Sequence, residues 1–145
     1  MTDSFEACSV EETWAVAARL AATLKPGDVI CLEGDLGAGK TTFTQGLAAA
    51  LGVRGRVTSP TFCIVQEHAA ASATHAGIPL FVHMDLYRLD GEEDVEAIGW
   101  EDYLSRGAAI AVEWPERAGG LVPPDAIRVK IESTGEDSRR ITITR

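Results

Sequence analysis

A glycine-rich octapeptide restricts what this 145-residue chain can fold into more than any other feature. Residues 34–41, Gly-Asp-Leu-Gly-Ala-Gly-Lys-Thr, match the pattern G-x-x-x-x-G-K-[ST] at every fixed position. The apolar run at residues 29–33 is rich in strand formers and suits a strand covered on both faces. Residues 40–51 are predicted to form a helix that ends at Gly52. Strand, glycine loop and helix in this order indicate the start of an α/β nucleotide-binding unit.

The glycine loop is suited to phosphate because its backbone can turn several N–H groups toward one anion. Glycine has no Cβ to block that approach, and the positive end of the following helix adds to the attraction. Lys40 is expected to reach the β- and γ-phosphates, the Thr41 hydroxyl to bind Mg²⁺, and Thr42 to contact the α-phosphate. The alternative is a glycine-rich turn with an exposed lysine. The predicted phosphate-binding residues are Gly34, Asp35, Leu36, Gly37, Ala38, Gly39, Lys40, Thr41 and Thr42.

A phosphate loop that acts on a nucleoside triphosphate also needs an acidic side chain near its metal ion. Asp85 follows the apolar residues 80–84, and Glu113 follows the apolar residues 108–112. Both acids therefore end predicted strands, where α/β sheets place their ligands, although either is also explained as a cap or a surface acid. His83 lies two residues before Asp85, on the same face of that strand. It is either close to the phosphates or a buried structural histidine.

The hydroxyl-rich segment Thr-Ser-Pro-Thr-Phe at residues 58–62 separates the predicted helix from the next strand. In P-loop switch proteins, a hydroxyl from this region senses the γ-phosphate and Mg²⁺. An ordinary Ser-Pro turn explains the same residues equally well, so the segment alone does not decide between the two.

The hydrophobic periodicity of the rest of the chain predicts a mixed sheet. Residues 11–24 are expected to form a helix, with Ser9 and Glu12 as a capping box. Further strands are predicted at residues 62–67, 80–85, 108–113, 127–132 and 140–144, and short acidic helices within 91–106. The last two strands alternate with period two, which is typical of half-exposed antiparallel strands. Because the sequence contains no repeat or linker, we expect residues 1–145 to form a single P-loop domain. The expected fold is an α/β three-layer sandwich with a mixed sheet, mainly parallel in its core and antiparallel at its edges.

The composition excludes some functions. The sequence has 22 acidic and 13 basic residues, a formal net charge of −9, whereas binding nucleic acid or an anionic membrane needs a surplus of Lys and Arg. No apolar run approaches the roughly 20 residues that span a bilayer, and residues 1–9 lack the layout of a signal peptide. The cysteines Cys8, Cys31 and Cys63 form no CxxC pair, which favours the reducing cytoplasm.

Four motifs occur together in one order along the chain. They are Gly-Asp-Leu-Gly-Ala-Gly-Lys-Thr-Thr-Phe at 34–43, Thr-Ser-Pro-Thr-Phe at 58–62, His-Met-Asp-Leu-Tyr-Arg-Leu at 83–89 and Val-Glu-Trp-Pro-Glu-Arg at 112–117. With these motifs the chain resembles the TsaE (YjeE) family, the small bacterial ATPases of tRNA threonylcarbamoyladenosine synthesis, over residues 9–145. The phosphate loop alone would not single out this family, but the last two motifs make the match close.

The resemblance implies a function as well as a fold. It implies a P-loop α/β domain that binds ATP with Mg²⁺ and hydrolyses it weakly when alone. It further implies that the protein works with the TsaD–TsaB heterodimer, which transfers a threonylcarbamoyl group to the adenosine beside the anticodon of ANN-decoding tRNAs. On this view the protein does not perform the transfer, and its ATP cycle resets the complex between rounds.

The resemblance also implies roles for individual residues. Lys40 and Thr41 match the Walker A pair of the family, and Asp85 matches its Walker-B-like aspartate. Glu113 matches the glutamate that the family assigns to Mg²⁺, and Thr61 matches its switch-like threonine. The implied catalytic residues are Lys40, Asp85, Glu113 and Thr61, and the implied metal ligands are Thr41, Asp85 and Glu113. How Asp85 and Glu113 divide the work stays open.

Other positions are implied to lie around the nucleotide. Trp114 matches the tryptophan that the family places next to the nucleotide. Ser9 and Thr13 fall where the family contacts the adenine end, without a sharp motif in this sequence. Phe62 stands in place of the usual tyrosine, which preserves stacking but removes a hydroxyl and any hydrogen bond that it made.

Two further functions fit the phosphate loop by itself. A small-molecule kinase would transfer the γ-phosphate to an acceptor hydroxyl, but it normally needs a lid that carries arginines, and Arg88 and Arg117 are the obvious candidates for that role. A nucleotide-binding switch would bind ATP without useful turnover. Release of phosphate, formation of a phosphorylated metabolite, or neither, distinguishes the ATPase, the kinase and the switch.

Overall fold

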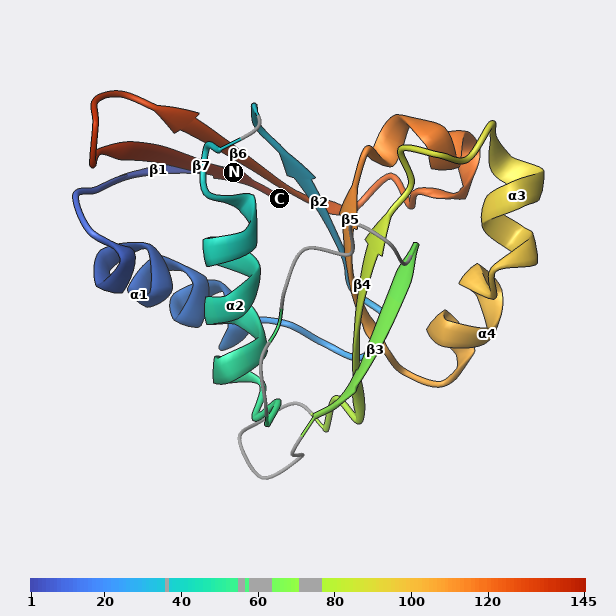
Figure 1. The fold of residues 1–145 in the computed structure, drawn as a ribbon. Helices are drawn as coiled ribbons and strands as arrows, with labels where there is room; N and C mark the ends of the chain where they lie inside the picture. Colours follow the sequence, from blue (N-terminus) through green and yellow to red (C-terminus); the bar gives the residue numbers. More distant parts are fainter. Residues whose placement is uncertain (36, 55–56, 58–63, 71–76) are drawn as a thin grey trace.

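A single sheet separates two groups of helices in the computed structural model, which describes residues 1–35, 37–54, 57, 64–70 and 77–145. Helices α1 (Val10–Ala21) and α2 (Lys40–Ala50) cover one face of the sheet. The other face carries α3 (Glu92–Ala97), α4 (Trp100–Ser105) and the 3₁₀ helix η1 (Pro115–Leu121) (Figure 1). The predicted three-layer α/β sandwich is therefore confirmed.

The part of the chain that the structure describes forms a sheet of seven strands in the order β1-β7-β6-β2-β5-β4-β3. The strands are β1 (Thr2–Ala7), β2 (Val29–Glu33), β3 (Val65–Ala69), β4 (Leu80–Asp85), β5 (Ala109–Glu113), β6 (Ile127–Ser133) and β7 (Arg139–Thr144). The central strands β6, β2, β5 and β4 are parallel to one another, and β3, β7 and β1 pair antiparallel at the two edges. This confirms the predicted mixed sheet with a parallel core. Because β2, β4 and β5 are parallel, their carboxyl ends meet at one edge of the sheet.

Alternate residues of the central strands pack against opposite helical layers. In β2, Ile30 and Leu32 belong to the core shared with α1 and α2, whereas Val29 and Cys31 belong to the core shared with α3 and α4. Each of these side chains is at most 2% exposed, so β2 is covered on both faces, as its apolar sequence predicted. Burial holds the pKa of the Cys31 thiol above its ordinary value, as expected for a structural cysteine.

The ends of some predicted elements differ from the structure. The helix predicted at residues 11–24 ends at Ala21, because the Thr23 hydroxyl and the backbone N–H of Thr23 both donate to Leu20 O and close the last turn. Its N-terminus is capped as predicted, since Ser9 Oγ accepts a hydrogen bond from Glu12 N at 3.1 Å. The strand predicted at 127–132 is antiparallel only toward β7, because its other edge pairs in parallel with β2.

Two elements have no counterpart in the sequence prediction. Strand β1 (Thr2–Ala7) pairs antiparallel with β7, from Thr2 opposite Thr144 to Ala7 opposite Arg139. Most of its side chains are exposed because it is an edge strand, so it lacks the apolar alternation that would have indicated it. The 3₁₀ helix η1 follows Trp114 and was also missed. Among the described residues, no helix has both the length and the apolar character that crossing a bilayer requires.

Candidate functional site

The glycine loop joins the carboxyl end of β2 to the N-terminus of α2 and lies close to β6. A Cβ added to Gly34 would lie 2.6 Å from the backbone oxygen of Ile131, so only glycine allows the loop to approach β6 this closely. Gly39 precedes α2 with a φ of 110°, a left-handed conformation that other residues rarely adopt. These two glycines fix the course of the loop at the edge of the sheet.

The N-terminus of α2 opens onto a cavity that suits an anion. No side chain among the described residues caps this 11-residue helix, and its first turn contains no acidic residue. The positive end of the helix dipole is therefore left for a ligand. The cavity has a volume of about 500 Å³ and is lined by Gly34, Asp35, Gly37, Gly39, Lys40, Thr41, Thr42, Asp85, Glu113 and Trp114. The structure thus brings most of the predicted phosphate-binding residues and both candidate carboxylates to one place, whereas Ala38 is buried and does not line this cavity.

The two candidate carboxylates come from neighbouring parallel strands. Asp85 ends β4 directly opposite Glu113, which ends β5. Asp85 is half-buried, and its Oδ1 accepts a hydrogen bond from the backbone N–H of Tyr87 at 3.1 Å. Glu113 is deeper, with 8% of its side chain exposed. The shared register of the two strands explains why residues 28 positions apart in the sequence meet at one cavity.

Both oxygens of Glu113 have a partner. Lys40 Nζ lies 3.6 Å from Glu113 Oε1, and His83 Nε2 lies 2.8 Å from Glu113 Oε2. Burial, the largest single influence on the pKa of Glu113, raises it, but the hydrogen bond and charge of His83 together with Lys40 outweigh burial and hold this pKa below its ordinary value. Glu113 is therefore ionised at neutral pH.

Trp114 lies beside Glu113 in an unusual backbone conformation. Its φ of 58° and ψ of 52° are left-handed, and among the described residues no other residue except glycine has a positive φ. The side chain lines the cavity, is 40% exposed, and packs against Tyr87 with ring centroids 4.9 Å apart and planes tilted by 53°. The structure therefore brings the sequence-predicted tryptophan to the mouth of the cavity and adds Tyr87 as its neighbour.

A second cavity of about 360 Å³ lies on the α1 side of the loop and contains Ser9 and Thr13. Its lining residues are Cys8, Ser9, Val10, Thr13, Gly37, Gly39, Thr42, Asp137 and Arg139. Gly37, Gly39 and Thr42 line the first cavity as well. The two cavities are thus neighbours that share these three residues, and the structure brings Ser9 and Thr13 together at the second one.

Sequence reasoning missed both charged residues at this second cavity, Asp137 and Arg139. The guanidinium of Arg139 donates to Ser138 O at 2.9 Å within the β6–β7 connection and to Gly37 O in the glycine loop at 3.5 Å. It thereby ties the β6–β7 hairpin to the glycine loop. The local sequence offered no signal, because Arg139 sits in an alternating polar strand like any exposed arginine. Of the predicted site residues, Leu36 and Thr61 lie outside the described residues, as does the segment at 58–63.

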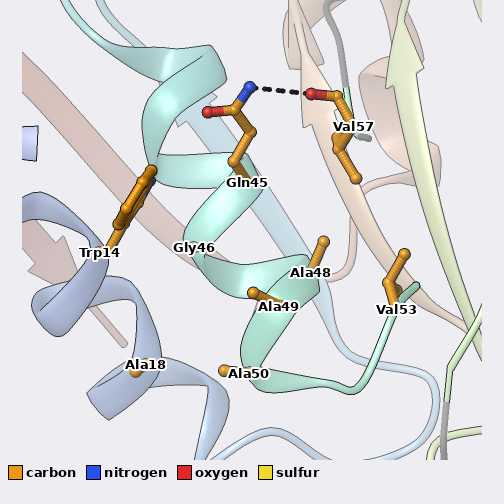
Figure 2. A pocket seen from close by; sticks show the side chains of 9 residues that line it. All are labelled: Trp14, Ala18, Gln45, Gly46, Ala48, Ala49, Ala50, Val53 and Val57. Atoms are coloured by element: carbon orange, nitrogen blue, oxygen red, sulfur yellow. Dashed lines mark hydrogen bonds between the residues drawn. The ribbon is translucent and has the colours of Figure 1, made fainter. Parts of the chain in front are cut away.

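An apolar cavity of about 510 Å³ lies between α1 and α2, away from the glycine loop (Figure 2). Trp14 and Ala18 from α1 face Gly46 and its neighbours on α2, and the one hydrogen bond drawn there joins Gln45 Nε2 to Val57 O at 2.9 Å. None of its described lining residues carries an ionisable side chain. In this respect it differs from the two cavities at the glycine loop, which are lined by charged side chains.

Known proteins are similar to this chain over most of its length. The family model described as "Threonylcarbamoyl adenosine biosynthesis protein TsaE" matches residues 7–141. A protein of that name from Bacillus subtilis is 43% identical over 134 residues, covering 92% of this chain and 80% of that protein. One from Streptomyces coelicolor is 43% identical over 131 residues, covering 87% and 85%. The crystal structure of Bacillus subtilis YdiB superposes with a TM-score of 0.77 at 35% identity, covering 99% of this chain and 84% of that one. The resemblance is thus confirmed, and the chain belongs to the TsaE family of tRNA threonylcarbamoyladenosine biosynthesis proteins.

Proposed function

We propose that this protein binds ATP with Mg²⁺ and hydrolyses it in support of tRNA threonylcarbamoyladenosine synthesis. The observation that carries the proposal is the single cavity at the N-terminus of α2, where the glycine loop, Lys40, Thr41, Asp85 and Glu113 converge. Backbone N–H groups, a helix N-terminus and one lysine are the groups that hold a nucleotide's phosphates. We assign the phosphates to this cavity.

The donor groups of the cavity fit Mg²⁺. The Thr41 hydroxyl and the carboxylates of Asp85 and Glu113 supply hard oxygen ligands. Among the described residues, no cluster of three or more His, Cys, Asp or Glu side chains is able to hold a metal on its own. That agrees with Mg²⁺, which usually takes the rest of its ligands from phosphates and waters. When bound, the ion would neutralise charge that develops on the phosphate oxygens during transfer.

The protein's own groups would orient the nucleotide. Lys40 would leave Glu113 for the β- and γ-phosphates, since a point charge there stabilises the developing negative charge. The second cavity, with Ser9 and Thr13, would take the adenine end, because it adjoins the phosphate cavity through a shared loop. Trp114 would lie beside the nucleotide. Thr61 remains our candidate for sensing the γ-phosphate by analogy with other P-loop proteins.

We further propose that the ATP cycle supports the TsaD–TsaB heterodimer in the cytoplasm and that the protein itself does not bind tRNA tightly. The net charge of −9 supports the second point, because non-specific affinity for tRNA comes mainly from Lys and Arg that displace counterions. A reconstituted modification assay at limiting TsaD–TsaB tests the first point. Multiple turnovers that depend on this protein are expected, and equal turnover without it would contradict the proposal. Salt-sensitive, tight filter binding of tRNA by the isolated chain would contradict the second.

The activity itself is tested by thin-layer analysis of γ-labelled ATP. We expect labelled phosphate from the wild-type protein and a loss of at least about a hundredfold in Lys40→Ala, since one charge on the transition state is removed. Lys25→Ala is the matched control, because Lys25 is exposed and its side chain lies outside both cavities. A phosphorylated metabolite in place of free phosphate would favour a kinase. Near-normal hydrolysis by folded Lys40→Ala would refute the assignment of the loop.

A further inference from the structure

His83 is a polar side chain in the most protected part of the sheet. It lies in β4 between Val82 and Met84, and all three residues are 0% exposed. Burying an imidazole is unfavourable unless it forms hydrogen bonds. Nε2 of His83 lies 2.8 Å from Glu113 Oε2, while Nδ1 has no partner among the described residues. The contact with Glu113 is therefore what compensates the burial of His83.

The direction of this hydrogen bond follows from the charge of Glu113. An ionised carboxylate only accepts hydrogen bonds, so the proton of the bond belongs to His83 Nε2. The assignment of the tautomer comes from this network. His83 is thus a fixed donor, held by the packing of β4 against β3 and β5, where it lies opposite Gln66 and Ala111.

The two oxygens of Glu113 are used separately. Oε2 accepts from His83, which is buried, and Oε1 faces Lys40, which lines the cavity. A ligand that draws Lys40 away would leave Glu113 with His83 alone. A buried carboxylate that loses every partner is strongly unfavourable. His83 therefore keeps the Glu113 side chain in place at the step when Lys40 changes partner.

We propose that His83 is a positioning residue, which holds Glu113 through Oε2 so that Oε1 stays turned toward the cavity as an oxygen ligand for Mg²⁺. This inference rests on the proposed function of the site. It assigns a purpose to an imidazole that otherwise interrupts an apolar strand. The competing explanation is a core histidine that only fills space, which would affect folding but not the metal.

Two amide substitutions separate these explanations, because each places its N–H at a different ring position. The amide nitrogen of glutamine reaches about as far as Nε2, and that of asparagine about as far as Nδ1. His83→Gln thus retains a donor toward Glu113, whereas His83→Asn does not. Both variants are neutral and polar, so they match each other in the cost of burial. Thermal unfolding curves of His83→Gln and His83→Asn identify a temperature at which both variants are folded, and the comparison is made there.

Metal binding is read without turnover, from the electron paramagnetic resonance of Mn²⁺ titrated into each protein with saturating ADP. Loss of a partner of a metal-binding carboxylate typically costs 10–100-fold in metal affinity. We expect His83→Asn to weaken Mn²⁺ binding by about tenfold or more and His83→Gln to restore it to within about threefold. ADP affinity in EDTA should change little in either variant. Equal Mn²⁺ affinity in wild type and His83→Asn, or equal losses in both variants, would overturn the proposal.

A second measurement needs neither variant nor metal. Nitrogen chemical shifts of the His83 ring in the wild-type protein report its tautomer, and we expect Nε2 to carry the proton. A proton on Nδ1 with bare Nε2 would overturn the role of His83 as donor to Glu113. If wild-type protein binds no Mn²⁺ with ADP, the proposed function of the site fails. If it binds Mn²⁺ and His83→Asn does so equally well, only the role of His83 fails.

Discussion

Gly34→Ala tests whether the glycine loop depends on its closeness to β6. A Cβ at this position would lie 2.6 Å from the backbone oxygen of Ile131, whereas ordinary van der Waals contacts of Cβ atoms begin near 3.4 Å. The oxygen belongs to Ile131, which pairs with Ile141 of β7 and directly follows the last residue of β6 that pairs with β2, so it has little freedom to retreat. The φ of 155° at Gly34 adds a conformation that residues with a side chain rarely adopt.

The size of the effect follows from these two contributions. Backbone strain at such a φ costs about 1–3 kcal/mol, and forcing an extra carbon into a packed site costs about 1–3 kcal/mol more. A loss near the middle of this range, about 4 kcal/mol, is a large part of the 5–15 kcal/mol by which a domain is typically stable. At roughly 2–4 °C per kcal/mol for a chain of this size, Tm should fall by about 10 °C. If the glycine loop relieves the close contact by moving away from β6, the ADP affinity of Gly34→Ala should fall as well.

The assay is thermal and urea unfolding followed by circular dichroism, with ADP affinity measured by calorimetry. Two other glycines serve as graded controls. Gly37 has a φ of 82° but nothing within 4 Å of an added Cβ, so Gly37→Ala should lose only the strain of about 1–2 kcal/mol. Gly91 is extended, with a φ of 173° and open space around it, so Gly91→Ala should unfold like wild type. If Gly34→Ala has the same Tm and urea midpoint as Gly91→Ala and binds ADP normally, the argument from the close approach is wrong.

Three further outcomes are expected. Thr41→Ala and Glu113→Ala should each raise the Mg²⁺ concentration for half-maximal hydrolysis by about tenfold or more; an unchanged Mg²⁺ dependence in Glu113→Ala would move the metal role to Asp85. The fluorescence of Trp114 should change on addition of ADP in a variant whose other two tryptophans are phenylalanine, because the indole lines the phosphate cavity; a flat titration with binding verified by calorimetry would refute its placement. The pKa of Glu113 is lower in the folded chain than its ordinary value of 4.5, so the unfolded chain binds more protons as the pH falls below 4.5. The stability that Glu113 contributes is therefore fully present above pH 4.5 and is lost as the pH falls through the folded-state pKa. Urea unfolding from pH 7 to pH 3 should therefore show a shallower acid-side loss in Glu113→Gln than in wild type, and parallel curves would contradict this.

The sequence predicted those parts of the fold that depend on local patterns. The strand at residues 29–33, the glycine loop and the start of α2 at Lys40 are each encoded by a short run of residues. The strand at 80–85 also has its predicted bounds, because apolar side chains buried on both faces leave a continuous signal. Edge strand β1 was missed, since its exposed side chains follow no hydrophobic period.

The site was predictable as a set of residue types but not as a set of contacts. Strand ends indicated that Asp85 and Glu113 would meet the glycine loop, because parallel strands bring their carboxyl ends to one edge. The bond between His83 and Glu113 depends on the lateral order of β4 and β5, which no local pattern encodes. The contact of Arg139 with the loop likewise depends on how the β6–β7 hairpin lies against it.

Asp85 and Glu113 illustrate how burial separates two residues that the sequence treats alike. Glu113 is the deeper acid, and each of its oxygens already holds a nitrogen partner, Lys40 at 3.6 Å and His83 at 2.8 Å. Asp85 is half-buried, and the one hydrogen bond that its carboxylate makes among the described residues comes from a backbone N–H, so no cation has to leave before it binds a ligand. On the proposed function Lys40 leaves Glu113 to reach a phosphate, so Glu113 is the acid whose contacts are linked to Lys40. Asp85 is free of that exchange, so we expect the two carboxylates to contribute at different steps even though they face the same cavity.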